Sequence, residues 1–120
     1  MVKKLIIGLI IILFAVPLYA ADISSTTCPG AGCTNINTEG SDFLSIQISG
    51  TFTGTITFSS SVDGTNFITT QVIPVGSATP VSTTTAVGIW GLELKGLKTV
   101  RVAFTAYTDG TAVVISRQLR

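Results

Sequence analysis

The stretch "FLSIQISGTFTGTITF", residues 43–58, alternates apolar and polar side chains almost without interruption. Its first half places Leu44 and Ile46 on one face, and its second half places Phe52 and Ile56 opposite a row of threonines. A period of two is typical of a β-strand with one buried side and one side in solvent. The stretch therefore predicts β-strands that bury an aliphatic and aromatic face and expose a threonine ladder.

The same β signals continue to the end of the chain. The segments "NFITTQVIPV", "GIWGLEL", "TVRVAFTAY" and "TAVVISRQL" are rich in β-branched residues, and Gly or Pro marks most of the joins. About seven strands at this spacing predict an all-β, antiparallel, immunoglobulin-like β-sandwich, with a jelly-roll or a small barrel as the alternatives. We assign this domain to residues 42–120.

Two Asp-Gly pairs are interpreted as structural turns. Asp109-Gly110 stands between two alternating runs in "AYTDGTAV", which is a strong hairpin signal. Asp63-Gly64 stands in "SSSVDGTNF", where the aspartate can bond its own backbone and the glycine permits a positive φ. The alternative for Asp63 is a ligand or metal site.

A hairpin at residues 109–110 also makes a prediction for Arg117. A two-residue turn there sets Val102 opposite Arg117, which is an awkward pair because Val102 belongs to the apolar face. Either a bulge shifts the register, or Arg117 pairs with a carboxylate such as Glu93.

The start of the chain has the layout of a secretory signal. Two lysines precede an apolar run at residues 5–18, and small residues follow, so we assign residues 1–20 to a signal peptide that is removed on export. An uncleaved membrane anchor is the alternative, because residues 5–21 are at the short limit for crossing a bilayer. The predicted location is the periplasm, the cell surface or the extracellular medium, including a virion, with membrane contact only through this segment.

Residues 21–41 are rich in Ser, Thr and Gly and lack periodicity, which predicts an arm ahead of the domain. Both cysteines lie there, in "CPGAGC", and an exported protein meets an oxidising environment. We expect a Cys28–Cys33 disulfide that closes a small loop, with an intermolecular disulfide as the alternative. Two thiols do not complete a tetrahedral metal shell, so no metal is expected.

The charge and the missing residue types argue against several function classes. The chain has no histidine and a formal net charge of +1. Without Lys3 and Lys4, five basic side chains remain against six acidic ones, so no strong field attracts nucleic acid. The carboxylates are scattered, and no Gly-rich phosphate loop leads from a strand into a helix. We therefore expect neither catalysis nor a cofactor.

Four side chains are candidate ligand contacts. Tyr107 shares a strand face with Arg101 and could stack on a sugar. The alternative is that it packs in the core or at the rim of the β-sandwich, as aromatic residues at such positions also do. Lys95, Lys98 and Arg101 lie close in sequence and could contact an anionic glycan or a protein, with a solvated rim as the alternative.

The order "SGTFTGTITF", "SVDGTNF" and "AVGIWGLELKGLKTVRVAFTAYTDGTAVV" resembles the small immunoglobulin-like β-sandwich modules of tailed-phage virion proteins. The resemblance implies a non-enzymatic decoration or attachment protein whose partner is a protein surface or further copies of itself. The signal segment and the cysteine loop depart from that pattern, which fits an exported structural or surface-adhesion module. The alternative function is a carbohydrate-binding module of a secreted or cell-surface protein.

Overall fold

The computed structural model describes residues 22–120, and the predicted signal peptide lies outside them. In the described part, the high content of β-branched residues produces an all-β, antiparallel fold, as the sequence predicts. The strands are β1 (Asp22–Cys28), β2 (Gly32–Asn37), β3 (Phe43–Ser61), β4 (Ile68–Thr69), β5 (Ile73–Pro74), β6 (Thr83–Thr84), β7 (Gly88–Glu93) and β8 (Thr99–Leu119).

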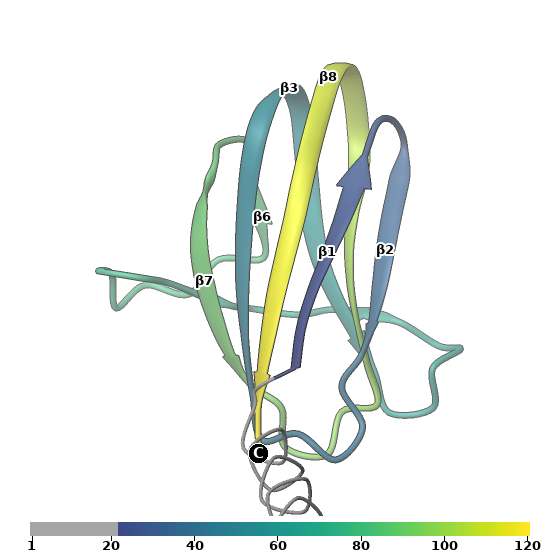
Figure 1. Cartoon of the computed structure of the whole chain (residues 1–120), viewed down its shortest axis with the longest axis vertical. Coiled ribbons are helices and arrows are strands. Elements are labelled where there is room, and N and C mark those ends of the chain that lie inside the picture. The colour runs from purple at the N-terminus through teal and green to yellow at the C-terminus, as the bar shows by residue number, and fades with distance from the viewer. Residues whose placement is uncertain (1–21) are drawn as a thin grey trace, which may run out of the picture.

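Two long strands organise the sheet. β3 and β8 pair in antiparallel fashion along their whole length, from Phe43 opposite Leu119 to Ser61 opposite Thr99. Both arch over at the same level, so the sheet folds back on itself and its two halves face each other (Figure 1). The alternating stretch at residues 43–58 is thus one bent strand rather than two strands joined by a turn.

The bend is made by glycines, and it corrects the predicted hairpin. Gly50 and Gly110 both have positive φ, 99° and 90°, and a Cβ at Gly110 would collide with the backbone of Thr51. Asp109 and Gly110 lie inside β8, next to a register shift in the pairing with β3. The hairpin prediction was wrong because β3 offers partners on both sides of this Asp-Gly pair, so the strand bends and continues.

Without that hairpin, Arg117 has different neighbours from those predicted. Arg117 pairs with Ser45 on β3 and Ile23 on β1, on an exposed side of the sheet. The expected contact with Glu93 is not formed, since the Glu93 carboxylate pairs with the Lys95 ammonium at 4.0 Å.

The core lies between the two facing halves of the sheet. One half contributes Leu44, Ile46 and Trp90, and the other contributes Phe58 and further aliphatic side chains. Phe58 and Trp90 meet across the interface with ring centroids 5.5 Å apart. The inward positions are those that the alternation in residues 43–58 predicts. The buried apolar residues are Cys28, Ile36, Leu44, Ile46, Ile48, Ile56, Phe58, Val72, Trp90, Leu94, Val100, Val102, Phe104, Ala112 and Val114.

The sheet topology differs from that of an immunoglobulin domain, which has two separately hydrogen-bonded sheets. Here β3 and β8 run through both halves, so the described strands form one eight-stranded sheet with the main order β1-β8-β3-β7-β5. β2 pairs with β8, and both β4 and β6 pair with β3, in the second half. The antiparallel all-β class is confirmed, whereas the immunoglobulin-like division into two sheets is not present.

Residues 22–41 belong to this sheet and do not form a separate arm. β1 pairs with the C-terminal part of β8, and β2 pairs with its N-terminal part. Cys28 and Ile36 are 2% and 6% exposed, so both contribute to the core. The arm prediction was wrong because β1 and β2 lie at an edge of the sheet, where exposed Ser and Thr side chains hide the strand periodicity.

Candidate functional site

The turn that follows β3 is built around the carboxylate of Asp63. One of its oxygens accepts hydrogen bonds from the Ser61 hydroxyl at 2.6 Å and from the backbone N–H groups of Thr65 and Asn66 at 2.8 and 2.9 Å. The other oxygen accepts a bond from the Asn66 side-chain amide at 2.7 Å. Gly64 follows with a φ of 80°. The carboxylate therefore bonds its own turn.

These hydrogen bonds change the acidity of Asp63. The Ser61 hydroxyl has the largest effect, followed by the backbone N–H groups of Asn66 and Thr65, and together they hold the pKa of Asp63 well below its usual range. A carboxylate that accepts four donors in its own turn is a poor proton acceptor for a substrate. The geometry favours a structural role for Asp63.

The three basic candidates have different surroundings. Lys95 lies in the turn after β7 and pairs with Glu93. Arg101 lies on β8 with its guanidinium over the Phe67 ring, 3.7 Å from the centroid, and its Nε donates to the Asn35 side-chain oxygen at 3.0 Å. Stacking and hydrogen bonding thus engage Arg101 within the molecule, whereas the Lys98 side chain is exposed to solvent.

Tyr107 is held by its surroundings. Its hydroxyl lies 2.9 Å from the Pro29 carbonyl oxygen and 2.7 Å from the Gly110 carbonyl oxygen. Its ring contacts the Phe104 ring edge-on, with centroids 5.1 Å apart. Because the ring is half-buried and the hydroxyl is engaged, Tyr107 does not present the exposed platform expected for sugar stacking.

The two cysteines form the disulfide that joins β1 to β2. Their Cα atoms are 5.3 Å apart, within the range of protein disulfides. Cys28 is buried and Cys33 is exposed, so the bond connects the core to the surface. Since β1 and β2 pair with different halves of the bent β8, the disulfide fastens the two halves of the sheet at this edge.

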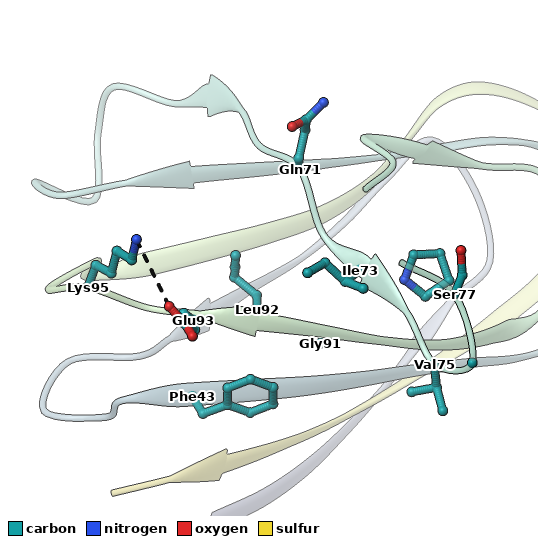
Figure 2. Close-up of a pocket in the computed structure, with 11 residues that line it drawn as sticks. Phe43, Gln71, Ile73, Val75, Ser77, Gly91, Leu92, Glu93 and Lys95 are labelled. Carbon is teal, nitrogen blue, oxygen red and sulfur yellow. Dashed lines mark ion pairs between the residues drawn. The ribbon is translucent and has the colours of Figure 1, made fainter. Parts of the chain in front are cut away.

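A groove of about 660 Å³ lies at the opposite edge, beside β5 and β7. Gly91 forms part of its lining, and the Phe43 ring is so close that a Cβ at Gly91 would lie 2.9 Å from it. Ile73 and Leu92 point toward the same space, and the Glu93–Lys95 ion pair lies at the end away from Val75 (Figure 2). The groove is therefore mainly aliphatic, and Gln71, Ser77 and the Glu93–Lys95 ion pair supply its polar lining.

Sequence reasoning missed this groove, although a signal was present. In "QVIPV" and "GIWGLEL", which contribute to the groove, apolar residues fall on both faces of the strand rather than on one. In the structure, Ile73 and Val75 are 49% and 72% exposed. Strands that are apolar on both sides and exposed on one side indicate a surface that can contact another molecule.

The described part of the chain, residues 22–120, holds no group of three or more His, Cys, Asp or Glu side chains placed to bind a metal ion. It also holds no helix with the length and hydropathy needed to cross a membrane.

No protein-family profile and no curated protein sequence matches the chain. Two solved structures share its fold. The SPBc2 prophage-derived protein YomS superposes with a TM-score of 0.69 at 17% identity, over 82% of this chain and 95% of YomS. The PBSX exported protein XepA superposes with a TM-score of 0.70 at 20% identity, over 82% of this chain but 38% of XepA. The fold is thus one found in prophage-derived and exported proteins.

Proposed function

We propose that the chain is an exported, non-enzymatic structural module that attaches to a protein surface, in a decoration or adhesion role like that of phage virion modules. The observation that carries the proposal is the aliphatic groove beside β5 and β7. Ile73 and Val75 at this groove are exposed to solvent, and such surfaces are stabilised by packing against a complementary apolar surface. The same fold occurs in a prophage-derived protein, YomS, and in an exported protein, XepA, which agrees with an exported module of phage type.

Export is supported by two features of the chain. The N-terminal segment has the layout of a signal peptide, and Cys28 is bonded to Cys33 within the sheet. Disulfides of this kind persist in oxidising compartments such as the periplasm and the extracellular medium. A carbohydrate-binding role gains no such support, because the Tyr107 ring is packed against Phe104.

The attachment role can be tested by fractionating cultures of the cell that encodes the protein. We expect the exported protein to co-sediment with cell envelopes or with phage-like particles. Ile73→Asp with Val75→Asp should release it into the soluble fraction, because both substitutions place charge at the groove. Thr83→Asp with Thr85→Asp adds the same charge at two exposed positions away from the groove and should leave sedimentation unchanged.

The proposal fails if the wild-type protein stays soluble in every fraction. It also fails if the groove variant sediments as the wild type does while remaining folded by circular dichroism. A catalytic turnover traced to the purified chain would contradict the non-enzymatic part of the proposal.

A further inference from the structure

The edge strands of the described sheet differ in how well they are protected from pairing with another chain. Proteins protect such edges with very short strands and with proline, which has no backbone N–H. β5, at one end of the sheet order, has two residues, and one of them is Pro74. β4 and β6 are equally short. β2 has six residues, but the carbonyl oxygen of Asn37 accepts a hydrogen bond from the Gln118 side-chain amide at 2.7 Å.

β1, at the other end of the sheet order, lacks this protection (Figure 1). It has seven residues and pairs with β8 without a register shift, from Asp22 opposite Gln118 to Cys28 opposite Ala112. Residues 23–28 include no proline, glycine or charged side chain. The disulfide to Cys33 fixes one end of the strand. β1 is therefore a long and regular edge strand that is already held in an extended form.

The pairing pattern shows which backbone groups of β1 point outward. The backbone groups of a strand point to its two sides alternately, and hydrogen-bonded residues point toward each other. The Val75 N–H donates to the Ile89 carbonyl oxygen at 2.9 Å, so the odd-numbered residues of β7 point toward β5 and the even-numbered ones toward β3. Followed through the registers of β3 and β8, this alternation directs the even-numbered residues of β1 toward β8. The N–H and C=O groups of Ile23, Ser25 and Thr27 point outward.

These six outward groups form the outer edge of β1. Within residues 22–120, no hydrogen bond reaches them. The side chains of Ile23, Ser25 and Thr27 are uncharged and exposed, so they leave the backbone accessible. Donors and acceptors that recur at every second residue are complementary to the backbone of another strand about 4.8 Å away. The outer edge of β1 therefore has the chemistry to recognise an extended polypeptide.

The size of this edge favours a flexible segment over a second folded copy. Seven residues give a length of about 20 Å, and a strand about 10 Å thick gives an area on the order of 200 Å². Two folded copies that meet along this strand would bury on the order of 400 Å², whereas specific interfaces bury about 1,200 Å² or more. A flexible segment is not limited to the edge, because its ends can continue over the neighbouring surface.

We propose that the outer edge of β1 binds an extended segment of a different protein, which becomes an additional strand of this half of the sheet. The inference goes beyond the proposed function, because β1 lies at the opposite edge from the groove beside β5 and β7. Backbone hydrogen bonds to Ile23, Ser25 and Thr27 hold the segment. Hydroxyl or β-branched side chains on its outer face fit best beside these three residues.

A peptide with the sequence of residues 111–119, TAVVISRQL, is a suitable probe, because this sequence already pairs with β1 within the protein. Added to isotope-labelled exported protein, it should shift the amide NMR signals of Ile23, Ser25 and Thr27, with a dissociation constant of about 1 mM or lower. Ser25→Pro should raise this constant at least about tenfold, since it removes an outward N–H and keeps the hydrogen bonds to β8. Ser25→Ala is the control and should leave the constant unchanged.

Methylated peptides test the same contact without any change in the protein. In a peptide that keeps the side-chain faces of β8, the N–H of Ile115 points toward β1 and that of Val114 points away. A methyl group on the backbone nitrogen of Ile115 should therefore abolish binding. The same methyl group on Val114 should preserve it.

Three results would overturn the proposal: no binding at several times about 1 mM peptide, equal binding by a folded Ser25→Pro variant, or equal binding of the two methylated peptides. Shifts of the same amide signals with protein concentration alone would show that a second copy occupies the edge, which overturns the assignment to a different protein. The groove variant Ile73→Asp with Val75→Asp should bind the peptide as the wild type does. Failure of the attachment role and failure of the β1 edge are thus measured separately.

Discussion

The guanidinium of Arg101 lies over the ring of Phe67, 3.7 Å from the ring centroid. Arg101 also donates a hydrogen bond to Asn35 on β2, so one side chain on β8 connects β2 with the segment that follows the Asp63 turn. A residue that the sequence marks as a candidate ligand contact thus joins three parts of the fold.

A double-mutant cycle measures this contact. Arg101→Met, Phe67→Leu and the double variant should show a coupling free energy of about 0.5–1 kcal/mol in urea unfolding, the range for exposed cation–π pairs. Asn35→Ala provides the control, because it removes the hydrogen bond and leaves the ring contact in place. Strictly additive effects of the two substitutions would show that the stacking contributes nothing to stability.

Glycine at position 110 is required by the bend in the long strands. Gly110→Ala should lower the free energy of unfolding by about 3 kcal/mol or more, because the new Cβ collides with the backbone of Thr51 and Phe52. Gly40→Ala is the matched control, since Gly40 has a φ of 80° but has no atom within 4 Å of a Cβ. This variant should lower the free energy of unfolding by about 1 kcal/mol, because a non-glycine residue there has an unfavourable positive φ but no collision. Equal losses in the two variants would contradict the close approach at the bend.

The Asp63 turn predicts a pH dependence of stability. Because folding lowers the pKa of this carboxyl, its stabilising effect is fully present above the ordinary value of about 3.9 and is lost as the pH falls through the lower folded-state value. Asp63→Asn should therefore be less stable than the wild type at pH 6, and the difference should shrink below about pH 4. Chemical unfolding at several pH values measures it, with Asp42→Asn as a control outside the turn. A difference that stays constant down to pH 2 would exclude this role.

Removing the disulfide should loosen the edge formed by β1 and β2. Cys28→Ala with Cys33→Ala should lower the free energy of unfolding by about 2 kcal/mol, the loop-closure effect for so short a ring. Reduction of the wild-type protein should have a similar effect, and hydrogen exchange in β1 should become faster. Covalent dimers on a non-reducing gel of the wild-type protein would instead show that the cysteines bond between chains.

Several features of the fold follow directly from local sequence. The alternation at residues 43–58 predicts which side chains are buried, because apolar side chains recur at every second position of a strand that has one buried face. The spacing and the expected compartment predict the Cys28–Cys33 bond, which the structure contains. Both predictions depend only on residues that are close together in the sequence, so the arrangement of the other strands does not alter them.

Other features depend on partners that local sequence does not reveal. Asp109-Gly110 favours a turn on its own, but pairing with β3 keeps it within β8. β1 looks like a polar linker until β8 supplies its hydrogen bonds. Likewise, the sequence suggests that the Arg101 and Tyr107 side chains are free to bind a ligand. In the structure, Arg101 stacks on Phe67 and Tyr107 bonds the Pro29 carbonyl oxygen.

The place of β8 after the strands that it pairs with has a consequence for folding during synthesis. β8 provides the hydrogen-bonding partners of β1, β2 and most of β3, and the ribosome makes it after all three. Contacts between strands so distant in sequence form slowly, and here they cannot begin before β8 has emerged. The sheet thus cannot assemble before β8 has been made, and this delay fits the export that we propose, because a narrow translocation channel accepts unfolded chains.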